Sequence, residues 1–108
     1  AMAAYNAGRY EEALALFGAL PEGTLQMELL NLYTGTAALQ AGQPDLAEQA
    51  LAQTARSATG YAPAGQWYLA LTYLQQKKTA LAKPLLEELR QEGAYKQKSA
   101  GELLDQLP

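Results

Sequence analysis

Paired carboxylates are the residues of this chain with the clearest potential for chemistry. Glu11-Glu12 and Glu87-Glu88 are each neighbours in sequence, and carboxylates can act as general acids and bases. Neighbouring side chains on a helix point about 100° apart, so neither pair would converge on one substrate atom. The chain has no histidine to serve as a base, and no serine lies in a nucleophile-elbow or base-paired setting. We therefore predict no catalytic residue and a protein that is not an enzyme.

Metal and thiol chemistry are poorly supported because the side chains that usually perform them are missing. Cysteine and histidine are both absent, and these residues supply the usual zinc ligands as well as disulfides and reactive thiolates. No glycine-rich phosphate loop follows a strand-like segment. We expect no metal site and no cofactor, whereas the lack of cysteine is compatible with any compartment.

The charge of the chain is mildly acidic, with a net charge of −3 from eight basic and eleven acidic residues. Nucleic-acid-binding proteins usually carry a basic face. Here the closest basic cluster is Lys77-Lys78, which we interpret as a solvated turn. No apolar run approaches the ~20 residues that span a bilayer. We expect no nucleic-acid partner and no membrane contact by this segment itself.

The composition predicts an all-α protein of one domain, residues 1–108. Leu and Ala dominate, and the β-branched residues Val and Ile are absent. Apolar residues recur at the helical period, and glycine, proline and polar residues mark the breaks. The pattern predicts a helix end at 1–6 and helices over 10–20, 24–41, 44–54, 63–74, 79–92 and 95–107. Pro84 is expected to bend the first turn of its helix or to delay its start.

Four columns of residues repeat with steps of 34 and then 35 residues. They are Gly8, Gly42 and Lys77; Ala13, Ala47 and Ala82; Phe17, Leu51 and Leu86; and Ala1, Gly35 and Ala70. Small residues at equivalent places predict helices that approach one another closely. The period predicts a partial unit over 1–22, units over 24–58 and 62–92, and, because it then stops, a capping helix over 94–107.

A helix pair repeated every 34 residues resembles the tetratricopeptide repeat family. The run Gly8-Arg9-Tyr10-Glu11-Glu12-Ala13, followed by Phe17, is similar to the hairpin turn and second helix of that family, and the resemblance covers residues 1–92. It implies an α-solenoid of antiparallel helix hairpins, in which stacking buries faces that one hairpin cannot bury alone.

The chain departs from the family pattern in each of its units. The first unit lacks most of its first helix. The second unit has Pro44 where the first has Tyr10, and the third has Lys77 in place of the turn glycine.

In this family the first helices line a concave groove that binds extended peptides or partner helices. Carried over position by position, the groove-facing residues are Tyr5, Leu32, Thr36, Leu39, Gln40, Trp67, Leu71, Leu74 and Gln75. The spacing independently places Trp67, Leu71 and Leu74 on one face of one helix. No Lys or Arg occupies these positions, so the carboxylate clamp of some family members is not expected.

The resemblance therefore implies a non-catalytic scaffold that binds a protein or peptide partner in an apolar groove. The alternative is a structural or oligomerisation segment of a larger protein, with the groove covered by upstream residues or by a second copy of the chain. The two interpretations differ in the expected size, a monomer with a free groove or a dimer.

The C-terminal half is also similar to the tetratricopeptide tails of membrane-anchored bacterial proteins. The similarity rests on W-Y-L-A-L-T-Y-L from Trp67 and on Pro84 to Leu89, together with Tyr95 and Leu103-Leu104. In those proteins the repeats lie outside the inner membrane. The resemblance leaves the periplasm and the cytoplasm of a bacterium both open and favours the periplasmic side.

Overall fold

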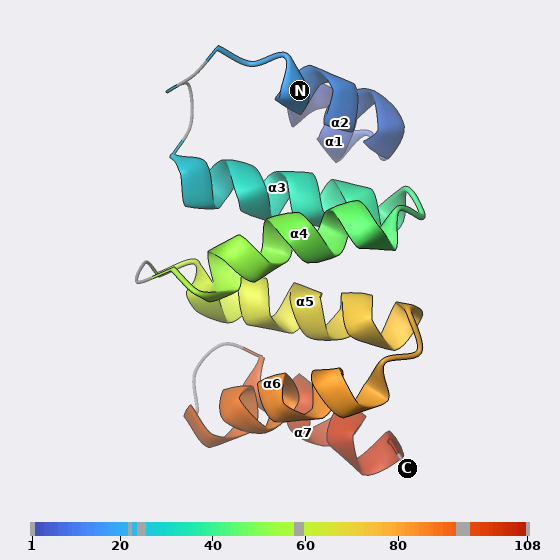
Figure 1. Ribbon diagram of the computed structural model, residues 1–108, viewed down its shortest axis with the longest axis vertical. Helices are drawn as coiled ribbons and strands as arrows, with labels where there is room; N and C mark the ends of the chain where they lie inside the picture. The colour runs from blue at the N-terminus through green and yellow to red at the C-terminus, as the bar shows by residue number, and fades with distance from the viewer. Residues whose placement is uncertain (1, 22, 24–25, 58–59, 93–95, 108) are drawn as a thin grey trace.

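The chain folds into a stack of helices that follow one another in sequence order. The computed structural model describes residues 2–21, 23, 26–57, 60–92 and 96–107. These residues form seven α-helices and no strand, which confirms the all-α prediction. The helices are α1 (Met2–Asn6), α2 (Tyr10–Gly18), α3 (Met27–Gln40), α4 (Pro44–Ala55), α5 (Ala62–Gln75), α6 (Thr79–Glu92) and α7 (Gln97–Gln106). Each packs against the next, from α1 and α2 at one end to α6 and α7 at the other (Figure 1).

The helix boundaries lie within a few residues of the predicted ones, and α6 spans the predicted 79–92. The predicted helix over 24–41 begins at Met27, and Ala1, Thr24 and Tyr95 lie outside the described residues. The expected delay at Pro84 is wrong, because α6 already begins at Thr79 and continues through the proline. Pro84 and Ala80 are both exposed, so water can satisfy the Ala80 carbonyl that the proline leaves without a donor.

The three turns that connect the two helices within each pair share one backbone conformation. Gly8, Gly42 and Lys77 have φ angles of 81°, 76° and 63°, in the left-handed region. In each turn the following N–H reaches the carbonyl five residues back. These bonds join Arg9 to Ala4 at 2.9 Å, Gln43 to Ala38 at 2.9 Å and Lys78 to Tyr73 at 2.7 Å. This is the Schellman helix ending, so Lys77 adopts the conformation for which glycine is usually selected.

The core consists of three buried clusters arranged along the stack. Their members are Ala4, Ala13, Phe17 and Ala37 in the first; Ala38, Ala47, Leu51 and Leu69 in the second; and Ala70, Ala82, Leu86, Leu89 and Ala100 in the third. Each cluster draws on three successive helices, so the core continues from one helix pair to the next. Ala13, Ala47 and Ala82 are completely buried, which confirms the prediction of close packing at this column.

Two glycines lie where neighbouring helices approach each other closely. A Cβ added to Gly35 would overlap the Leu51 side chain of α4, and one added to Gly65 would lie 2.7 Å from the backbone nitrogen of Ala55. A real Cβ atom would make neither contact, so the absence of a side chain at Gly35 and Gly65 lets α3 and α5 lie this close to α4. The sequence pattern identified Gly35 but gave no sign of Gly65.

Candidate functional site

The predicted binding residues lie on α1, α3 and α5, the first helices of the three pairs. On α3 and α5 they form equivalent pairs 35 residues apart. These pairs are Leu32 with Trp67, Thr36 with Leu71, Leu39 with Leu74, and Gln40 with Gln75. The two helices α3 and α5 also pack against each other. We call these eight residues and Tyr5 the first-helix row.

Thr36 and Tyr5 form a hydrogen bond that joins α3 to α1. The Thr36 hydroxyl lies 3.1 Å from the Tyr33 carbonyl oxygen, which can only accept, so the single Thr36 proton is donated there. The Tyr5 hydroxyl, 2.9 Å from Thr36 Oγ1, must then be the donor of the second bond. Thr36 is only 6% exposed, so its role in the row is to fix Tyr5 in place.

An aromatic cluster surrounds Tyr5. Its ring makes edge contacts with Tyr10, Phe17 and Tyr33 at centroid distances of 5.7, 6.3 and 5.3 Å. Phe17 and Tyr33 stack at 6.0 Å. Such offset and edge-on arrangements stabilise aromatic pairs beyond the burial of their area. Tyr5 on α1 is therefore held by ring contacts from both α2 and α3.

Trp67 has a packing role as well as a partly exposed surface. Together with Leu74 it packs against the buried cluster that contains Ala70 and Ala82. The Lys96 ammonium group, from the residue just before α7, lies 5.8 Å from the Trp67 ring centroid. This is a cation–π distance, and spacing within one helix could not have revealed it.

The remaining apolar members of the row differ in how they are supported. Leu32 and Leu39 are half-buried and pack against the cluster of Ala38, Ala47, Leu51 and Leu69. Leu71 is half-buried too, but it is not among the residues packed against any of the three described clusters. The row therefore keeps part of its apolar surface exposed, and the exposed Gln40 and Gln75 lie at its end.

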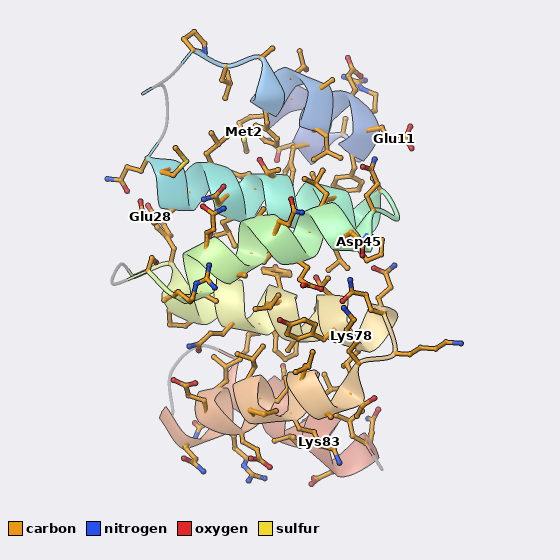
Figure 2. The ribbon with its side chains drawn as sticks, in the orientation of Figure 1. Met2, Glu11, Glu28, Asp45, Lys78 and Lys83 are labelled. Carbon is orange, nitrogen blue, oxygen red and sulfur yellow. The ribbon has the colours of Figure 1, made fainter. Side chains whose placement is uncertain are left out.

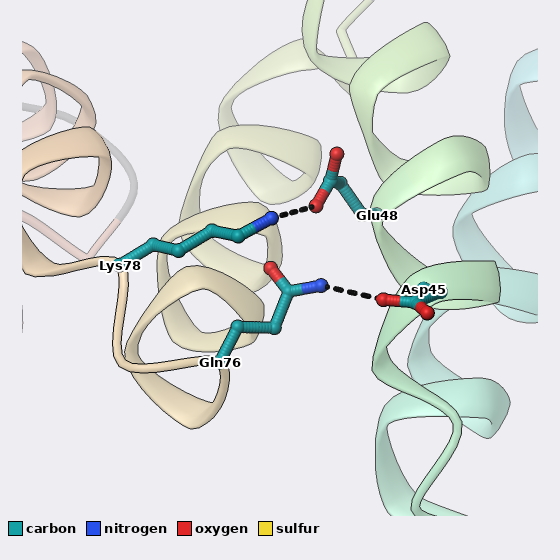
Figure 3. Close-up of polar contacts among 4 residues, drawn as sticks. All are labelled: Asp45, Glu48, Gln76 and Lys78. Carbon is teal, nitrogen blue, oxygen red and sulfur yellow. Dashed lines mark hydrogen bonds and ion pairs between the residues drawn. The ribbon is translucent and has the colours of Figure 1, made fainter.

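A polar bridge that sequence analysis did not predict links two neighbouring helix pairs. Gln76 Nε2 donates to Asp45 Oδ1 at 3.1 Å, and Lys78 Nζ lies 3.2 Å from Glu48 Oε1 (Figure 3). Figure 2 shows Asp45 and Lys78 on the same side of the stack, opposite Glu28. The expected solvated turn is correct for both Lys77 and Lys78, which are exposed, although Lys78 also pairs with Glu48. The ion pair is too exposed to add much stability.

Other kinds of site are not found in the part of the chain that the structure describes. It contains no detected pocket and no group of three or more acidic residues, cysteines or histidines suited to a metal ion. None of its helices has the length and apolar character needed to cross a membrane. The chain matches no model of a known protein family, no curated protein and no solved structure. Its function is therefore inferred from its own side chains.

Proposed function

We propose that this chain is a non-catalytic binding scaffold that holds a peptide or a helix of a partner protein along the first-helix row. We further propose that its helix pairs form a tetratricopeptide-like solenoid. The three equivalent turns at Gly8, Gly42 and Lys77 support the repeat, as does the complete burial of the alanine column.

The repetition of apolar residues at partly exposed positions is the observation that carries the binding proposal. Leu32 and Trp67 are equivalent, as are Leu39 and Leu74, and all four are half-buried. The two pairs lie seven residues apart on α3 and on α5, about two helical turns, with Leu71 between them on α5. A partner helix or peptide with apolar side chains at matching intervals would bury this surface, and the two glutamines could hydrogen-bond to its polar groups.

The row is also held in a fixed shape before any partner arrives. The Tyr5–Thr36 bond ties α1 to α3, and the contact of Gly35 with Leu51 locks α3 against α4. A surface on packed helices loses little conformational freedom on binding, and lower ordering costs favour affinity.

The test is a selection of binders from displayed libraries of extended and helix-forming peptides. Trp67 is the only tryptophan of the chain, so its fluorescence emission reports directly on occupancy of the row. We expect Leu32→Ser and Leu71→Ser each to lower the affinity for every selected peptide at least tenfold, about 1.4 kcal/mol of binding free energy. Leu81→Ser is the matched control, because Leu81 is 52% exposed on α6, outside the row.

Equal weakening by all three substitutions would contradict the proposed site, provided that circular dichroism shows each variant to be folded. Sedimentation of the unliganded chain distinguishes the structural alternative. A dimer at micromolar concentration that Leu71→Ser converts to a monomer would mean that a second copy covers the row.

A further inference from the structure

The first helix pair, α1 and α2, carries two apolar side chains that are open to solvent. Met2 is 37% exposed and Leu16 is 41% exposed. The steps of 34 and 35 residues place Met2 in one column with Thr36 and Leu71, and Leu16 in one column with Ala50 and Leu85. Among the later members, Thr36 and Ala50 are each 6% exposed, and Leu71 and Leu85 are half-buried.

The preceding helix pair contributes to the cover of both columns. Thr36 receives the hydrogen bond from Tyr5, which belongs to the first helix of the pair before it. Leu85 on α6 packs against the cluster of Ala38, Ala47, Leu51 and Leu69, most of which comes from α3 and α4. Met2 is thus equivalent to Thr36, and Leu16 to Leu85, and each of these two later residues contacts the preceding pair.

The opposite end of the stack has a different character. The partly buried Leu103, Leu104 and Leu107 pack against the last buried cluster. The exposed residues of α7 are polar, namely Gln97, Lys98, Glu102, Asp105 and Gln106. A terminal helix with a polar outer side closes a repeat stack, so among the described residues only the α1–α2 end presents an apolar stacking face.

We propose that the outer face of α1 and α2 is a stacking surface for one further helix pair of the same kind. The first helix of that pair covers Met2, as Tyr5 covers Thr36, and its second helix covers Leu16. The kind of occupant follows from the chain itself, because one helix pair stacks on the next at two junctions, between α2 and α3 and between α4 and α5. A second copy fits poorly, because this junction joins two different faces of a helix pair, and α7 covers the complementary face at the other end. The surface is separate from the first-helix row, so either proposal can fail alone.

The test is an extended chain in which residues 27–69 are joined directly ahead of Ala1. Ala70 and Ala1 belong to one column, so the join keeps the register of a first helix and places a copy of α3 and α4 on the proposed surface. We expect Leu16→Glu to lower the Tm by no more than about 2 °C in the 108-residue chain and by roughly 5 °C or more in the extended chain. Leu81→Glu, also at an exposed leucine, should have an equally small effect in both.

Thiol labelling provides a second measurement. The chain has no cysteine, so Leu16→Cys and Leu81→Cys each introduce a single site. We expect the extension to slow labelling at position 16 at least tenfold and to leave position 81 unchanged. Equal labelling in both chains, or an extended chain that does not fold cooperatively, would overturn the proposal. A dimer of the 108-residue chain that protects position 16 would also overturn it, in favour of a second copy.

Discussion

The Tyr5 hydroxyl donates a hydrogen bond to the buried Thr36 hydroxyl over 2.9 Å, from the first helix of one pair to the first helix of the next. The Thr36 proton is used on the Tyr33 carbonyl oxygen, so the direction of both bonds is fixed. Helices of neighbouring pairs are thus joined by a specific polar contact as well as by apolar packing.

This bond predicts that Tyr5→Phe lowers the free energy of unfolding by about 0.5–1.5 kcal/mol, since one buried acceptor loses a donor. Tyr10→Phe is the matched control. Its ring also contacts Tyr5, but no described hydrogen bond involves its hydroxyl. Urea denaturation of both variants measures the difference. Equal stabilities of Tyr5→Phe and Tyr10→Phe would show that the bond contributes nothing net.

The contact between Gly35 and Leu51 predicts opposite outcomes for one substitution at two helical glycines. Gly35→Ala should cost about 1–3 kcal/mol, because its methyl group overlaps the fully buried Leu51 side chain. Gly18→Ala should raise stability by up to about 1 kcal/mol, because nothing lies within 4 Å of the added carbon.

Combining Gly35→Ala with Leu51→Ala tests the cause. If the overlap is responsible, the two losses will not add, since the smaller residue makes room for the methyl group. Strict additivity in denaturant unfolding would mean that Gly35 matters for another reason.

The left-handed turn at Lys77 predicts a stabilising change. Lys77→Gly should raise the free energy of unfolding by about 0.5–1 kcal/mol, because glycine adopts positive φ without the steric cost of a Cβ atom. Gly42→Ala should lower it by about 1 kcal/mol for the same reason. Thermal unfolding measures both. Lys77→Ala is the control for loss of the exposed lysine side chain, and a gain as large as that of Lys77→Gly would contradict the backbone explanation.

Trp67 and Leu71 are predicted to differ although they lie one turn apart in the first-helix row. Trp67→Ala should cost about 2–4 kcal/mol of stability, because Trp67 packs against the last buried cluster. Leu71→Ala should cost about 1 kcal/mol or less, since no described cluster includes it. Denaturation and peptide titration of each variant separate the two roles. Leu71 is a binding residue only if its substitution weakens the peptide while stability is retained.

Much of the fold could be predicted from sequence because it depends on local properties. The helical period and the breaks at Gly8 and Gly42 lie within a few residues of the elements they define. The column of Ala13, Ala47 and Ala82 correctly indicated complete burial. The sequence left open whether Pro84 would delay the start of α6, because the cost of the proline depends on whether its exposed side lets water replace the lost bond.

For the candidate site, the sequence by itself determined which residues share a helix face, such as Trp67, Leu71 and Leu74. Only the tertiary structure decided what each face meets. It placed Lys96 over Trp67, joined Tyr5 to Thr36 and paired Lys78 with Glu48. The helical period fixes the direction in which each side chain points around the axis of its own helix. The rotation and offset between two helices are set by the packing of all their side chains together, so these contacts appear only in the folded chain.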